Sequence, residues 1–120
     1  MADRSMVITW GQVVRGREER ALDNFNAVVA YNAGLQSAGR VERFTVTLLS
    51  PNAVMGGFMQ LLGTGAQLAA VRDDREFQRL IVESSLIVDD LTVIDGYVDD
   101  GLAAQMALFQ EAIAKAPQMA

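Results

Sequence analysis

Residues 40–63, RVERFTVTLLSPNAVMGGFMQLLG, decide the fold because they predict a β-hairpin. Apolar and polar side chains alternate along the first arm, residues 41–49, where Phe44, Val46 and Leu48 are separated by Arg43, Thr45 and Thr47. An alternation of period two is typical of a strand that buries one face. Pro51 marks the turn, since proline fixes φ and lacks an N–H donor. Residues 57–62 are mostly apolar and return as a strand covered on both faces.

The rest of the chain predicts two further strands and a series of helices. Residues 6–14 and 91–98 are rich in β-branched and aromatic side chains, which favour strands. Apolar residues spaced by three and four predict helices over residues 17–38, 65–71, from 73 onward, and 102–115. Asp73 and Glu76 have the spacing of a capping box at the start of the third of these helices. The last helix carries an apolar stripe, made of Leu102, Met106, Phe109 and Ile113.

This order consists of two split βαβ units followed by a helix, which predicts an α+β fold of the ferredoxin-like βαββαβ type. We expect one antiparallel sheet and one domain over residues 1–120, since a chain of this length forms a single core. Right-handed crossovers place the first and third strands in the centre of the sheet and the second and fourth at its edges.

Composition limits the partners. Hydrophobic residues make up 51% of the chain, and two helices can cover only one face of the sheet. The other face is then too apolar to remain in water, which predicts a homodimer. The chain has 10 basic and 15 acidic residues and a net charge of −5, so nucleic acid is not expected as a partner.

The chain has no cysteine and no histidine. Their absence excludes thiol nucleophiles, Ser-His-Asp triads and histidine-ligated haem, and we expect neither a metal nor a cofactor. The N-terminal residues carry an acid and lead into no long apolar core, so they do not predict a signal peptide. No apolar run approaches the roughly 20 residues of a membrane span. We therefore expect a cytoplasmic protein without a membrane partner.

Several segments resemble a group of uncharacterised bacterial proteins, namely residues 16–22, 57–58, 68–77 and 101–106. The architecture resembles the dimeric α+β-barrel superfamily, in which two ferredoxin-like sheets face each other around a cavity. The group of uncharacterised bacterial proteins has no assigned activity that the resemblance could suggest for this chain. A His-Gly-Gly that is frequent before its third strand is replaced here by Met55-Gly56-Gly57, so a histidine role does not apply.

We expect the sheet face away from the helices to line an inter-subunit cavity, with candidate residues Trp10, Gln12, Arg43, Thr45, Thr47, Phe58, Gln60, Asp95 and Tyr97. Aromatic walls with a few polar groups are typical of small-molecule pockets. Aromatic residues also dominate dimer interfaces. For Trp10, Phe58 and Tyr97 we rank a place in the dimer core ahead of ligand binding.

Asp95 lies in the middle of a predicted strand, where a buried carboxylate needs a partner. We expect an ion pair with Arg43 across the dimer, ahead of a role as a catalytic acid. Loss of a buried pair predicts that Asp95→Asn destabilises the dimer by about 1–3 kcal/mol.

Two classes of function remain open. The first is a small-molecule-binding or interaction module that uses the inter-subunit cavity. The second is a cofactor-independent monooxygenase or isomerase acting on a small, partly aromatic molecule, which is what the superfamily resemblance implies. The lack of histidine and of any catalytic spacing ranks binding first, and no catalytic residue is assigned.

Overall fold

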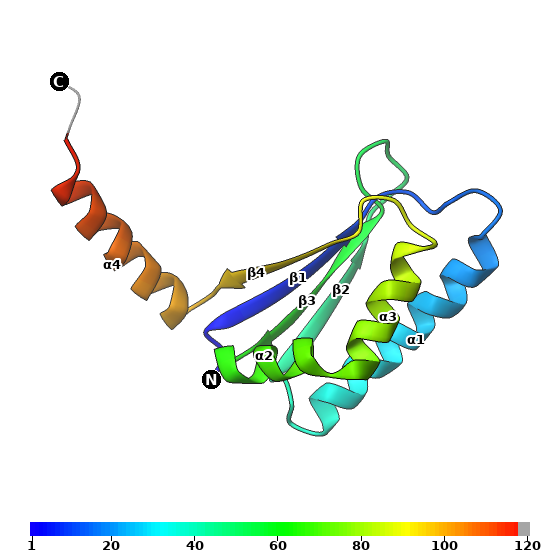
Figure 1. Ribbon diagram of the computed structural model, residues 1–120, viewed down its shortest axis with the longest axis horizontal. Helices are drawn as coiled ribbons and strands as arrows, with labels where there is room; N and C mark the ends of the chain where they lie inside the picture. Colours follow the sequence, from blue (N-terminus) through cyan, green and yellow to red (C-terminus); the bar gives the residue numbers. More distant parts are fainter. Residues whose placement is uncertain (118–120) are drawn as a thin grey trace.

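The computed structural model describes residues 1–117. The elements follow one another as a βαββααβα chain (Figure 1): β1 Arg4–Trp10, α1 Glu18–Ser37, β2 Arg43–Leu48, β3 Gly57–Gly63, α2 Gly65–Asp73, α3 Arg75–Ser85, β4 Thr92–Tyr97 and α4 Asp100–Lys115. The first strand was expected to reach residue 14 but ends at Trp10. Beyond it, the N–H of Gly11 donates to the carbonyl of Asp89 (2.7 Å), and Val13 forms an isolated antiparallel bridge with Val88.

The four strands form one antiparallel sheet in the order β2-β3-β1-β4. The first and third strands are central and the other two are edges, as predicted from the crossover rule. The α+β, ferredoxin-like arrangement is therefore confirmed. The hairpin of β2 and β3 has the predicted alternation, since Val46 pairs with Met59 on one face and Thr45 with Gln60 on the other.

Helices α1, α2 and α3 cover one face of the sheet (Figure 1). Met6 and Ile8 of β1 and Met59 and Leu61 of β3 point to this side and are almost completely buried. Opposite them the helices contribute Val28, Leu35, Leu68, Val71, Phe77 and Leu80. This layer is the core of the described residues, and burying such side chains is the main favourable term in folding.

The junction between α2 and α3 is fixed by side-chain caps. Thr64 and Gln67 form a capping box at the start of α2. The cap of α3 is Asp74 and not the predicted Asp73, because Asp73 is the last residue of α2. The Tyr31 hydroxyl donates to Asp74 Oδ2 (2.7 Å), which ties α1 to this junction.

The pKa of Asp74 lies below its ordinary value because the Tyr31 hydroxyl, the N–H of Glu76 and Arg40 all favour the carboxylate. A lowered pKa stabilises the fold above the unfolded pKa of about 4. That stability is lost as the pH falls through the folded pKa.

Tyr31→Phe should therefore lower the melting temperature at pH 7 and have a smaller effect at pH 3. Thermal melts at both pH values measure this. Tyr97→Phe is the control, since the Tyr97 hydroxyl takes part in no hydrogen bond described for residues 1–117. An equal loss at both pH values would show that the hydroxyl acts through packing and not through Asp74.

The last helix, α4, projects away from the rest of the domain (Figure 1). The radius of gyration is 17.1 Å, whereas a compact domain of this length has about 14 Å. The first turn of α4 is anchored, because a Cβ added at Gly101 would lie 2.0 Å from the carbonyl oxygen of Asp3. The N–H groups of Gly101 and Leu102 also donate to the carbonyl of Val98 (2.9 and 3.3 Å).

Gly101→Ala should destabilise the protein or reorient α4, since the backbone of Asp3 cannot give way by the distance a methyl group requires. Gly34→Ala in α1 is the matched control. No atom lies within 4 Å of its added Cβ, so this substitution should stabilise the helix by roughly 0.5–1 kcal/mol. Denaturant melts of both variants test the pair, and equal midpoints would contradict the close contact at Gly101.

Candidate functional site

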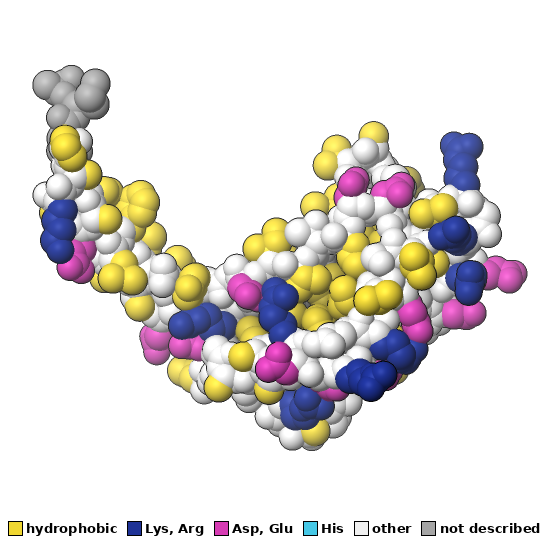
Figure 2. Space-filling model, in the orientation of Figure 1, with side chains coloured by type: hydrophobic (Ala, Val, Ile, Leu, Met, Phe, Trp, Pro, Cys, Tyr) yellow, Lys and Arg dark blue, Asp and Glu magenta, His cyan; other side chains and the backbone are white. Residues whose placement is uncertain are grey.

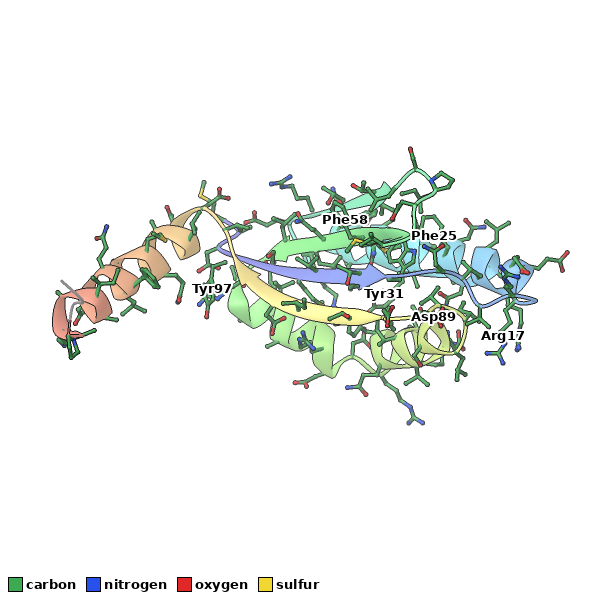
Figure 3. The ribbon with its side chains drawn as sticks, turned by 90° about the horizontal axis from the view of Figure 1, so that it is seen from above. Arg17, Phe25, Tyr31, Phe58, Asp89 and Tyr97 are labelled. Atoms are coloured by element: carbon green, nitrogen blue, oxygen red, sulfur yellow. The ribbon has the colours of Figure 1, made fainter. Side chains whose placement is uncertain are left out.

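Five of the nine candidate residues lie on the sheet face away from the helices, which we call the open face. They are Arg43, Thr45, Thr47, Phe58 and Gln60, which the pairing of β2 with β3 puts on the same side of the sheet. Phe58 is labelled in Figure 3. Val7, Thr9, Ile94 and Thr92 join them through the pairing of β1 with β3 and β4. Ile94 is 53% exposed, so part of this face is apolar and uncovered.

Three candidates lie on the opposite face, so their predicted direction was wrong. Trp10 packs toward α1, while Asp95 and Tyr97 pair with Met6 and Arg4 on the side of the helices. Asp95 was expected on the open face, which would put its neighbour Ile94 under the helices, because side chains alternate along a strand. Ile94 instead lies on the open face, so Asp95 turns to the other side.

Gln12 lies on neither face. It follows the end of β1, and its Nε2 donates to the carbonyl oxygen of Asn52 in the loop between β2 and β3 (2.8 Å). This contact ties two loops at one end of the sheet.

Asp95 has a different partner from the one expected. Its Oδ1 accepts hydrogen bonds from Arg72 of α2, at 2.9 Å from Nη2 and 3.2 Å from Nε. Arg43 lies on the open face of the other edge strand, so it cannot reach Asp95 within the subunit. The carboxylate is 65% exposed, and the pair lies beside a small hollow of about 230 Å³ rather than in a buried interface.

Asp95→Asn should therefore change the free energy of unfolding by less than about 1 kcal/mol, as exposed ion pairs do. This replaces the loss of 1–3 kcal/mol that burial would predict. Urea denaturation of the variant and of Arg72→Gln measures the effect, and a loss well above 1 kcal/mol in both would place the pair in a buried setting.

A pocket of about 370 Å³ lies between the sheet and helices α1 and α3. Its lining is mostly apolar, with Ile8, Trp10, Phe25, Met59, Ile81 and Leu91 among the contributing side chains. Pockets of this size and lining are typical of small-molecule sites. Trp10 therefore lines a pocket inside the subunit, and not the inter-subunit cavity for which it was predicted.

The indole of Trp10 packs against two glycines, Gly56 just before β3 and Gly57 at its first position. A Cβ at Gly56 would lie 2.8 Å from the indole Nε1, and one at Gly57 would lie 2.8 Å from Cζ2. Phe25 meets the indole edge-on, with ring centroids 6.2 Å apart. The two glycines therefore let a large aromatic ring form one wall of the pocket.

The polar groups of the pocket gather around Asn24 and Ser84. Ser84 Oγ lies 2.9 Å from Asn24 Oδ1 and 2.7 Å from the carbonyl oxygen of Leu80, and its hydroxyl can donate to either. The amide nitrogen of Asn24 is buried and has no hydrogen-bond partner among the described residues. An unpaired buried donor is costly, so this nitrogen is suited to meet an acceptor on a bound molecule.

Acid–base groups are scarce in this pocket. Glu18 is its one ionisable lining residue among those described, and both carboxylate oxygens accept from the N–H of Gly16 (2.8 and 2.9 Å). Within residues 1–117, no three acidic side chains gather as metal ligands would. No helix in this part of the chain is long and apolar enough to cross a membrane.

The residues that sequence reasoning missed come from α1, from the end of α3 and from the segment that follows it. Ala21, Asn24, Ser84, Ile87 and Val88 line the pocket without any motif in common. One signal was present in the sequence: a single tryptophan and a Gly-Gly pair, which the fold brings together.

No protein-family model matches the chain, and a search of curated proteins found no match either. Among solved structures, the chain is similar to a protein from Bacteroides fragilis NCTC 9343 that is described as dimeric, of unknown function and with a ferredoxin-like fold. The TM-score is 0.59 at 10% sequence identity, over 79% of this chain and 96% of the other. The likeness shows that this chain has the ferredoxin-like fold.

Proposed function

We propose that this protein binds a small, largely apolar molecule in the pocket between the sheet and helices α1 and α3, in each subunit of a homodimer. The observation that carries the proposal is the pocket of about 370 Å³, bounded by Trp10 and Phe25 and otherwise mostly aliphatic. The free donor of Asn24 favours a ligand with one hydrogen-bond acceptor, such as a carbonyl or ether oxygen.

The homodimer is supported by the uncovered face of the sheet. Val7, Phe58 and Ile94 lie there among threonines, and Arg43 is the one charged residue on the strands of this face. A face with so few charges is the kind of surface that interfaces bury. The Bacteroides protein with the same fold is described as dimeric, which agrees with this proposal.

Binding ranks ahead of catalysis. Cofactor-independent oxygenation or isomerisation needs a group that moves a proton at the reacting carbon. Glu18 is exposed and already engaged by the backbone of Gly16, and Asn24 and Ser84 are hydrogen-bonding groups without a basic partner. The pocket therefore supports recognition better than proton transfer.

Two experiments test the proposal, binding of a fluorescent probe in the pocket and a substitution that blocks the pocket. The apolar fluorescent probe N-phenyl-1-naphthylamine should bind the wild-type protein with increased emission and should quench Trp10, the one tryptophan of the chain. Ala21→Phe places a ring in the pocket and should weaken probe binding at least about tenfold, which is about 1.4 kcal/mol.

Ala27→Phe is the matched control, because Ala27 lies on the same helix, is exposed and does not line the pocket. It should leave binding of the probe unchanged. Equal binding by both variants, or no binding by the folded wild type, would contradict a ligand site at this place.

A further inference from the structure

Helix α4 leaves an apolar stripe uncovered. Leu102, Met106, Phe109 and Ile113 are between 46% and 61% exposed, and they recur at the spacing of one helix face. No charged residue occurs from residue 102 to residue 110. Isolated helices of this length are marginal in water, so a helix of this composition needs a surface to pack on.

The subunit itself does not supply that surface. Gly101 is the buried residue of α4, Gln105 is half-buried, and the other residues of this fully described helix are exposed. The anchored first turn directs the helix away from the domain, which accounts for the large radius of gyration. In Figure 2, hydrophobic side chains of α4 face a hollow that the body of the domain bounds on its other side.

We infer that α4 is an exchanged arm, whose stripe of Leu102, Met106, Phe109 and Ile113 packs against a second copy of this chain. The inference rests on the homodimer proposed above and names the segment that completes its interface. In a two-fold dimer each arm reaches the other subunit, so the contact is made twice.

Charge favours a second copy as the occupant of this arm. Each chain carries a net charge of −5, so two copies repel each other less where the surfaces that meet are nearly uncharged than where they are acidic. The stripe of α4 contains no charge, and the strands of the open face carry only Arg43. These two surfaces are therefore matched to each other.

Area gives a second argument. Four strands of six or seven residues make a face of about 20 Å by about 19 Å, near 400 Å² in projection. Stable interfaces bury about 800 Å² of each partner. An arm of 16 residues adds a surface about 24 Å long and about 10 Å wide, which brings the interface closer to that size.

Sedimentation velocity of two charged double variants tests the arm. Met106→Glu with Phe109→Glu places charges on the stripe and should raise the dimer dissociation constant at least about tenfold. Ala104→Glu with Leu108→Glu adds the same charges to the opposite side of the helix and should leave it unchanged. All four positions are exposed, so each variant should fold as the wild type does.

Hydrogen exchange adds a second measurement on Ile94→Glu, a variant designed to separate the subunits at the open face. Amides of α4 should be protected in the wild-type dimer and should exchange freely in this monomer. Amides that stay protected in the monomer would show that the arm packs on its own chain, which would overturn the inference.

The outcomes distinguish the claim that α4 is an exchanged arm from the claim that the protein is a dimer. A wild-type dimer that the stripe variant leaves intact would overturn the arm and leave the dimer standing. A monomeric wild type would overturn both. A wild-type oligomer larger than a dimer, reduced to a dimer by the stripe variant, would show that the arm joins dimers and would also overturn the exchange.

Discussion

Helices cover this four-stranded sheet on one face only, and the main features of the protein depend on that asymmetry. The covered face buries Met6, Ile8, Met59 and Leu61 and forms the core of the subunit. The open face presents Val7, Phe58 and Ile94 to the surroundings. A sheet with two partly apolar faces needs two covers, and the chain supplies one of them.

The pocket follows from how the covered face is packed. Gly56 and Gly57 lack the Cβ atoms that would otherwise collide with Trp10, so the indole lies against β3 and meets Phe25 of α1. The space beyond them, toward the end of α3, stays open and apolar. The buried amide of Asn24 gives this space a polar end, and that combination of shape and polarity leads to the binding proposal.

The sequence was sufficient for the fold because its strongest signals are periodic. The alternation from Phe44 to Leu48 and the three-four spacing in the helices depend on neighbours in the chain, and both predict the elements the structure has. The face of the sheet to which each side chain of β4 points was not predictable in this way. The sequence is compatible with either Ile94 or Asp95 on the open face, and only the pairing of β4 with β1 decides between the two.

The site was harder to predict than the fold. Its residues come from β1, α1, α3 and the segment after α3, and no motif connects Trp10 with Asn24 or Ser84. Hydrogen-bonding groups of this kind become a site only when packing leaves a space between them. Volume is a property of the folded arrangement, so it has no signature in the order of residues.

The claim on which the account depends most is that a second copy covers the open face. Light scattering coupled to size-exclusion chromatography of the unmodified protein at micromolar concentration tests it most directly. The account predicts a mass of twice 13.0 kDa. A single species of 13.0 kDa at every concentration, with the open face freely accessible to solvent, would contradict it.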